Sequence, residues 1–101
     1  MPKYILAYHR FAKFENLEAG ATAMKNWLGD MGEKCVDWGN PVGLSKTVSA
    51  DGIADNGGAN PLSGYSIIEA GDDAEACEMA KACPILSDGK GSVEVAPIME
   101  M

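Results

Sequence analysis

The sequence predicts an α+β domain whose elements follow one another in the order β-α-β-β-α-β. Two observations support this prediction. Two segments carry apolar residues at helical spacing, and four short runs rich in β-branched and aromatic residues lie between clusters of Gly, Pro, Asn and Asp. The chain has 101 residues, of which 47% are hydrophobic, so we expect one globular domain spanning residues 1–101.

The first strand and the first helix are predicted from the N-terminal third. Residues 3–10 (KYILAYHR) are apolar at both parities, with Ile5 and Ala7 between tyrosines and leucine, so this strand needs cover on both of its faces. Residues 15–34 are expected to form an amphipathic helix that stops near Gly32. Its apolar stripe comprises Leu17, Ala21, Met24, Leu28 and Met31, widened by Trp27.

The middle of the chain is predicted to be rich in loops. Residues 36–43 (VDWGNPVG) contain a Gly-Asn-Pro turn signal. Residues 44–50 (LSKTVSA) alternate in polarity and are expected to form the second strand, near a sheet edge. Residues 51–61 are dense in Asp, Asn and Gly, which predicts a loop or an irregular hairpin.

The C-terminal third predicts a strand, a helix and a final strand. Residues 64–70 (GYSIIEA) form the third strand, and Asp72 with Glu75 gives a D-x-x-E start that is close to a capping box. The helix that follows must end before Pro84. Residues 93–99 (VEVAPIM) form the last strand.

This order of elements favours a ferredoxin-like fold, with an antiparallel sheet and both helices on one face. The second face would then expose Ile5, Ala7, Ile68 and Ala70, or their neighbours of opposite parity. A contiguous apolar patch of this kind usually marks an interface, and a second copy related by a two-fold axis is the simplest cover. We therefore expect a homodimer.

Charge and cysteine content exclude several classes of protein. The net charge of −7 and the scattered basic residues argue against nucleic acid and against anionic membrane surfaces. No stretch approaches the roughly 20 apolar residues that span a bilayer, and the apolar run before His9 is too short for a signal peptide. We expect a cytoplasmic protein whose three cysteines, Cys35, Cys77 and Cys83, are reduced and buried.

Several segments of the chain resemble one known family. They are residues 64–70 (GYSIIEA), 72–76 (DDAEA), 82–86 (ACPIL) and 91–95 (GSVEV), with 39–41 (GNP) and 45–48 (SKTV) in the middle section. Together they resemble the YCII-related family, which includes the DGPF proteins and belongs to the dimeric α+β-barrel superfamily. The resemblance spans essentially the whole chain. It implies a dimeric barrel that can enclose a ligand, and it implies no particular activity.

Two departures from that family limit what the resemblance implies. The DGPF tetrapeptide is missing, and residues 55–58 (DNGG) followed by 60–62 (NPL) stand in that region. The founding branch is suspected of using a His–Asp pair with its histidine early in the first helix. Residues 15–24 contain no histidine, so that pair is not carried over.

His9 is the best candidate for acid–base chemistry because it is the only histidine and its ordinary pKa lies near neutrality. It ends the first strand, where the mouth of a barrel would lie, and Asp37 is the carboxylate proposed to orient it. The plainer interpretation is a strand-end histidine bonded to backbone or water. Asp37 would then belong only to an Asn-Pro turn.

Four further residues are candidates for binding a ligand. Trp38 and Asn40 lie in the turn beside Asp37, and Trp38 can either wall an apolar site or pack against the core. Tyr65 and Ser66 can offer hydroxyl groups from the third strand, although a tyrosine in a central strand is more often a core residue.

Motifs for metals, phosphates and nucleophilic catalysis are missing from the sequence. A loop starting at Asp51 fails the EF-hand pattern, since Ile53 and Leu62 stand where oxygen ligands are needed. Residues 89–92 (GKGS) lack the earlier glycine of a P-loop. We expect no metal and no cofactor.

Two hypotheses for function remain. The first is a small dimeric α+β-barrel protein that binds a small organic molecule or acts on it, with His9 as the acid–base residue. The second is a non-catalytic dimerisation module without a ligand pocket. Whether the protein is an enzyme is left open by the sequence.

Overall fold

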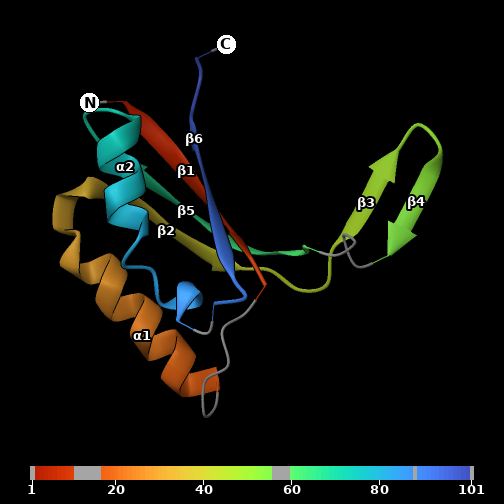
Figure 1. The fold of residues 1–101 in the computed structure, drawn as a ribbon, viewed down its shortest axis with the longest axis horizontal. Coiled ribbons are helices and arrows are strands. Elements are labelled where there is room, and N and C mark those ends of the chain that lie inside the picture. The colour runs from red at the N-terminus through yellow and green to blue at the C-terminus, as the bar shows by residue number, and fades with distance from the viewer. Residues whose placement is uncertain (1, 11–16, 56–59, 88, 101) are drawn as a thin grey trace.

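The computed structural model describes residues 2–10, 17–55, 60–87 and 89–100 (Figure 1). Its elements are β1 (Lys3–His9), α1 (Leu17–Asp30), η1 (Gly32–Lys34), β2 (Cys35–Pro41), β3 (Lys46–Ser49), β4 (Gly52–Asp55), β5 (Leu62–Glu69), α2 (Asp73–Ala80), η2 (Pro84–Leu86) and β6 (Ser92–Pro97). The predicted α+β class is confirmed.

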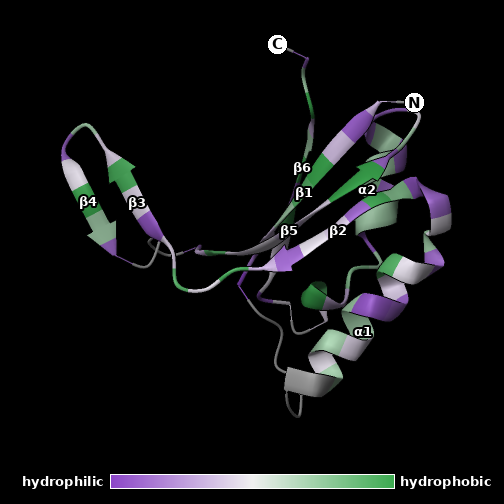
Figure 2. Ribbon diagram, turned by 180° about the vertical axis from the view of Figure 1, so that it is seen from behind, coloured by the Kyte–Doolittle hydropathy of each residue, from purple (hydrophilic) through white to green (hydrophobic). Residues whose placement is uncertain are grey.

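A four-stranded sheet with the order β2-β5-β1-β6 organises the domain, and the paired strands are antiparallel. Both helices lie on one face of this sheet, and the view from behind shows the other face without a helix on it (Figure 2). This arrangement is compatible with a ferredoxin-like fold.

The core lies between the helices and one face of the sheet. Alternate residues of β1 point into it, and Tyr8 meets Trp27 of α1 edge to face, with ring centroids 6.2 Å apart. Its buried hydrophobic members are Tyr4, Leu6, Tyr8, Trp27, Leu28, Ile68, Ala70, Ala76, Ala80, Cys83 and Ile85. The helix predicted for residues 15–34 is confirmed from Leu17 to Asp30, and residues 15 and 16 lie outside the described part of the chain. Of the predicted apolar stripe, Trp27 and Leu28 are in the core and Met24 and Met31 pack against it, whereas Ala21 is exposed.

The strand predicted within residues 44–50 is confirmed as β3, but its place as the second strand of the main sheet was wrong. Residues 35–41, which contain the turn signal, form β2 and pair with β5, whereas Lys46–Ser49 pairs with Gly52–Asp55 in a separate two-stranded hairpin. The Gly-Asn-Pro segment fits a strand because β2 is irregular: its register with β5 shifts twice, and Gly39 adopts a φ of 70°. Pro41 is tolerated since β2 is an edge strand.

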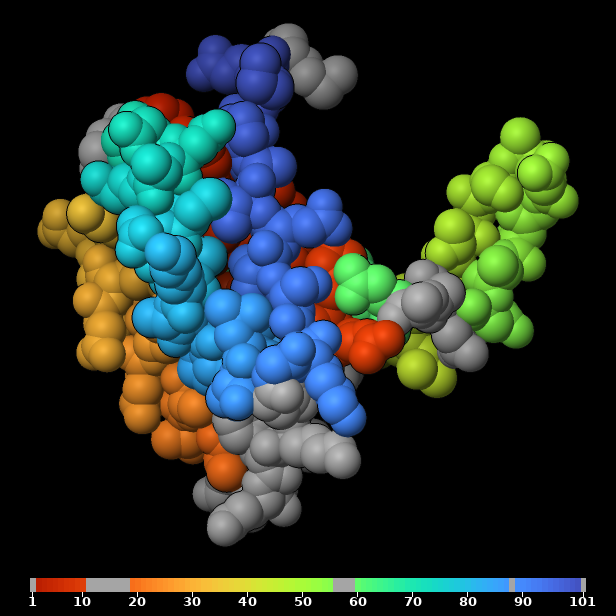
Figure 3. All heavy atoms as spheres, in the orientation of Figure 1, coloured from red at the N-terminus to blue at the C-terminus, as the bar shows by residue number. Residues whose placement is uncertain are grey.

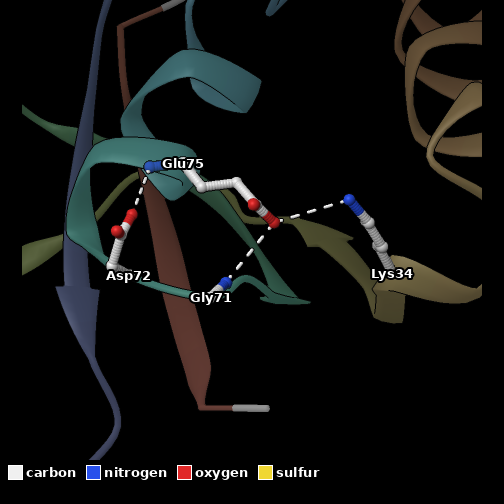
Figure 4. A network of polar contacts seen from close by, with 4 residues as sticks. All are labelled: Lys34, Gly71, Asp72 and Glu75. Atoms are coloured by element: carbon white, nitrogen blue, oxygen red, sulfur yellow. Dashed lines mark hydrogen bonds and ion pairs between the residues drawn. The ribbon is translucent and has the colours of Figure 1, made fainter.

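The start of α2 confirms the capping prediction. Asp72 is the N-cap, and its Oδ1 accepts a hydrogen bond from the Glu75 amide at 2.9 Å. Glu75 Oε1 in turn accepts from the Gly71 amide at 3.3 Å and from Lys34 Nζ at 3.4 Å (Figure 4). This network ties the beginning of α2 to the beginning of β2.

The second face of the sheet, which we call the open face, carries residues that alternate with the core residues. Ile5 and Ala7 lie on it, as expected from the sequence, together with Tyr65 and Ile67 of β5. Ile68 and Ala70 were considered for this face, but both are fully buried beneath the helices. Without a partner, the four open-face side chains are half-buried.

The hairpin formed by β3 and β4 projects from the body of the molecule, and we call it the arm (Figures 1 and 3). Every residue of its two strands is exposed. Lys46 Nζ and Asp55 Oδ1 form an ion pair at 2.6 Å across the two strands. The sequence prediction of a loop or irregular hairpin after residue 50 is therefore partly right.

Candidate functional site

His9 ends β1, and two acceptor oxygens flank its ring. Its Nδ1 lies 3.0 Å from the carbonyl oxygen of Asn60, and its Nε2 lies 2.6 Å from Oε1 of Glu94. The His9 side chain is only 13% exposed, whereas that of Glu94 is 72% exposed. The ring is thus held in place on one side and reaches a solvent-accessible carboxylate on the other.

The carbonyl of Asn60 fixes the tautomer of neutral His9. A carbonyl oxygen can only accept a hydrogen bond, so Nδ1 must carry the proton and donate it. Nε2 is then the atom that can take up or release a proton. Nε2 is buried and forms no hydrogen bond of acceptable geometry. Its approach to Glu94 Oε1 is an ion pair only while the His9 ring carries a second proton, on Nε2.

The backbone after His9 turns sharply. Arg10 has a φ of 64°, a left-handed conformation that costs a non-glycine residue about 1–2 kcal/mol. Two hydrogen bonds hold it: the Arg10 amide donates to the Pro61 carbonyl at 3.0 Å, and the Arg10 carbonyl accepts from Ser63 Oγ at 2.8 Å. They anchor the end of β1 to the segment that enters β5, which also supplies the Asn60 carbonyl.

Glu94 is the site residue that the sequence analysis missed. It lies on β6, where it pairs with Ala7 of β1. Two residues further along β1, on the same face of the sheet, His9 pairs with Ser92. The alternation in VEVAP indicated a polar residue on the face opposite Val93 and Val95. The contact itself depends on how β6 pairs with β1, for which the sequence carried no signal.

One row of residues crosses the open face on all four strands. Asn40 pairs with Tyr65, Tyr65 pairs with Ala7, and Ala7 pairs with Glu94. Directly opposed residues in antiparallel strands place their side chains on the same face. The structure therefore puts two of the predicted ligand-binding residues, Asn40 and Tyr65, on the same face as His9.

Asp37 is not brought to His9. Asp37 pairs with Ile67 of β5, and Ile67 pairs with Ile5 of β1. His9 is therefore two strands away from Asp37, and four residues further along β1 than Ile5. At about 4.8 Å per strand and about 3.3 Å per residue, the Cα atoms are roughly 16 Å apart. The Asp37 carboxylate instead accepts a hydrogen bond from the Gly39 amide at 2.8 Å.

Ser66 has a role other than the predicted one, and the backbone carbonyl of Trp38 takes part in it. Ser66 is fully buried on the helix side of the sheet, where it accepts a hydrogen bond from the Tyr8 hydroxyl at 2.7 Å. Its own hydroxyl donates to the Trp38 carbonyl at 2.7 Å. This chain of hydrogen bonds joins β1, β5 and β2 and leaves the Ser66 hydroxyl unavailable to a ligand on the open face.

The cysteines are free thiols in three different environments: Cys83 is buried, Cys35 is half-buried and Cys77 is exposed. The prediction that all three are buried was therefore wrong for Cys77. Within the described residues, no group of three or more His, Cys, Asp and Glu side chains is arranged to hold a metal ion. None of the helices in that part of the chain is both long and apolar enough to cross a membrane.

Burial of two ionisable groups predicts a loss of stability in alkali. Burial raises the pKa of the Cys83 thiol to about 11, and it also raises the pKa of the Tyr8 hydroxyl. Both groups keep their protons in the folded state at a pH where the unfolded chain has lost them. The Cys83 thiol should therefore lower the free energy of unfolding by about 2 kcal/mol between pH 9 and 11, and the Tyr8 hydroxyl should add to this loss above pH 10.

Urea unfolding at a series of pH values measures this effect. Cys83→Ala should remove the decline between pH 9 and 10 and leave the smaller decline caused by Tyr8 above pH 10. Cys77→Ala should leave the whole decline unchanged because Cys77 is exposed. An identical decline in the wild type and in Cys83→Ala would contradict the assignment.

The fold and the site define a class of protein: a small α+β domain with one antiparallel sheet, two helices on one face and a histidine–glutamate contact on the other. No family model, no curated protein and no solved structure matches this chain.

Proposed function

We propose that the chain forms a homodimer that binds a small organic molecule at the open face of its sheet and exchanges a proton with it through His9. The observation that carries this proposal is the contact of His9 Nε2 with Glu94 Oε1 at 2.6 Å, with Nδ1 facing the Asn60 carbonyl. With Nδ1 held by the Asn60 carbonyl and Nε2 buried against Glu94, the ring would exchange a proton with a ligand through the exposed Glu94 carboxylate.

The dimer is supported by the distribution of apolar side chains. Helices cover one face of the sheet, while Ile5, Ala7, Tyr65 and Ile67 occupy the other. Burying this face against the same face of a second copy would remove the apolar surface from water and create an isologous interface. This is the assembly that the resemblance to the YCII-related proteins implies, and membership in that family is part of the proposal.

The chemistry of the open face restricts the ligand. Tyr65 offers a hydroxyl, Asn40 offers an amide, and His9 with Glu94 offers a site for one proton, all beside the aliphatic side chains of Ile5 and Ala7. A small molecule with an apolar body and one or two hydrogen-bonding groups fits this set. Glu94 takes the place that the sequence analysis gave to Asp37.

Because His9 is the only histidine, labelling with ring-¹⁵N histidine gives one pair of ring signals. Because the Asn60 carbonyl can only accept a hydrogen bond, we expect the Nδ1 signal of a protonated nitrogen. Glu94→Gln should shift the Nε2 signal, while the matched change Asp37→Asn should leave both ring signals in place. Equal responses to the two variants would refute the His9–Glu94 pair.

The same labelled protein tests ligand binding. A library of small organic fragments at millimolar concentration should include compounds that shift the His9 ring signals, and Tyr65→Phe or Asn40→Ala should weaken their binding. Exposed Val36, on β2, provides a control position, since Val36→Ala should leave binding unchanged. If no fragment shifts the ring signals, the ligand-binding proposal fails.

A second candidate is a non-catalytic dimerisation module. It is favoured by the large apolar side chains that the arm exposes, which are more typical of a surface for protein contacts than of a free surface. This candidate predicts the same homodimer with no fragment bound at His9. Fragment binding therefore separates the two functions.

A further inference from the structure

The arm presents large aliphatic side chains to solvent. Leu44, just before β3, is 94% exposed, Val48 is 74% exposed and Ile53 is 71% exposed. Val48 and Ile53 are directly opposite one another in the hairpin and therefore lie on the same side of it. The opposite side carries the smaller pair Thr47 and Ala54. We call the side of Val48 and Ile53 the apolar side of the arm; the ion pair between Lys46 and Asp55 lies on this side as well, two residues away along each strand.

An arm of this kind is not stable by itself. A two-stranded hairpin without further cover is at best marginally stable in water, because it buries little apolar surface against the entropy of ordering its backbone. The arm stands clear of the body of its own chain (Figure 3). Among the described residues none covers Val48 or Ile53, so we look for their cover in another molecule.

We propose that the apolar side of the arm packs against the second copy of the chain in the homodimer; this inference rests on the proposed dimer. The arm leaves the sheet where β2 ends and β5 begins, next to the Asn40–Tyr65 pair at the same end of the open face. A second copy therefore covers both unpartnered surfaces, and two-fold symmetry gives each arm the same contact.

The reach and the charge of the arm fit this partner. The chain from Pro41 to Ala50 spans up to about 30 Å when extended. The molecule is only 20 Å deep along its shortest axis, so an arm can extend along a partner of this size. Lys46 and Asp55 are the charged residues of β3 and β4, and they neutralise each other in an ion pair. The two strands of the arm therefore add little electrostatic repulsion between two chains that each carry a net charge of −7.

The arm is also connected to His9. After the arm, the chain enters β5 through Asn60 and Pro61. The Asn60 carbonyl faces His9 Nδ1, and the Pro61 carbonyl accepts a hydrogen bond from the Arg10 amide. Docking of the arm would hold this segment and thereby fix the orientation of the His9 ring. Dimer formation and the state of the site are thus expected to change together.

Two adjacent residues of β4 provide a matched test. Ile53→Asp places a charge on the apolar side of the arm, and Ala54→Asp places the same charge on the opposite side. Sedimentation equilibrium should show that Ile53→Asp raises the dimer dissociation constant at least about thirtyfold, the effect of losing a central interface residue. Ala54→Asp should change the constant less than about threefold.

The outcomes separate the two proposals. If Ile53→Asp dimerises as tightly as Ala54→Asp, or if both variants weaken the dimer equally, the arm contact is refuted. Ile5→Asp, on the open face, should still dissociate the dimer in that case, and the proposed homodimer would stand. If the wild type sediments as a single chain of 10.6 kDa at every concentration, both proposals fall.

Discussion

Gly39→Ala is expected to prevent stable folding. A Cβ atom on Gly39 would lie 1.7 Å from the carbonyl oxygen of Tyr65 and 2.6 Å from its carbonyl carbon, both of which are backbone atoms of the central strand β5. The φ of 70° adds a backbone conformation that alanine rarely adopts. Since β2 must move away from β5, we expect a loss of more than about 4 kcal/mol, a large part of the stability of a domain this size.

Gly32→Ala is the matched control for this prediction. Gly32 also has a positive φ, of 59°, but nothing lies within 4 Å of the position of its Cβ. Its replacement should cost only about 1 kcal/mol, the penalty for the left-handed conformation. Urea unfolding followed by far-UV circular dichroism measures both variants, and a Gly39→Ala protein as stable as Gly32→Ala would show that β2 does not follow the path described.

Ser66→Ala is expected to have the second-largest effect. The buried Ser66 hydroxyl accepts from Tyr8 and donates to the Trp38 carbonyl, so its removal leaves two polar groups without their partner. Each buried group that loses its hydrogen bond costs about 1–3 kcal/mol. We expect the free energy of unfolding to fall by about 2–4 kcal/mol, measured by urea denaturation.

Ser63→Ala supplies the comparison on the same strand. Ser63 is also buried, and its hydroxyl makes one hydrogen bond, to the Arg10 carbonyl. Its loss should cost about 1–2 kcal/mol. If Ser63→Ala is the more damaging of the two variants, the hydrogen-bond chain through Ser66 does not have the importance assigned to it. A double-mutant cycle with Tyr8→Phe would then measure the coupling directly.

Tyr65 and Ser66 show how far the sequence predicts the site. Both were candidates for offering a hydroxyl group to a ligand, although neighbouring residues of a strand point to opposite faces of the sheet. Which face would be covered by helices depended on packing with α1 and α2. The structure buries Ser66 with the core and leaves Tyr65 on the open face, so only Tyr65 remains in the candidate site.

The site shows the same division between local and distant information. His9 was identified as the only histidine of the chain, at the end of a predicted strand. Its carboxylate partner was sought at Asp37, but strand pairing brings Glu94 to it instead. A pairing register is set by many contacts between distant segments, and no local pattern records it.

The sequence by itself determined the features that depend on nearby residues. Helical spacing predicted α1, the D-x-x-E signal predicted the start of α2, and the two apolar faces of β1 indicated that the sheet needs cover on both sides. Each of these signals lies within a few turns or residues of the chain, where side-chain periodicity and capping act.

Only the tertiary structure decided which middle segment enters the sheet. Residues 44–50 alternate in polarity more clearly than residues 35–41, yet β2 is the segment that pairs with β5. The glycine at position 39 allows the close approach to Tyr65, and the Trp38 carbonyl receives the hydrogen bond of Ser66. These contacts stabilise β2 across a long sequence separation, whereas the arm keeps its regular alternation and remains exposed.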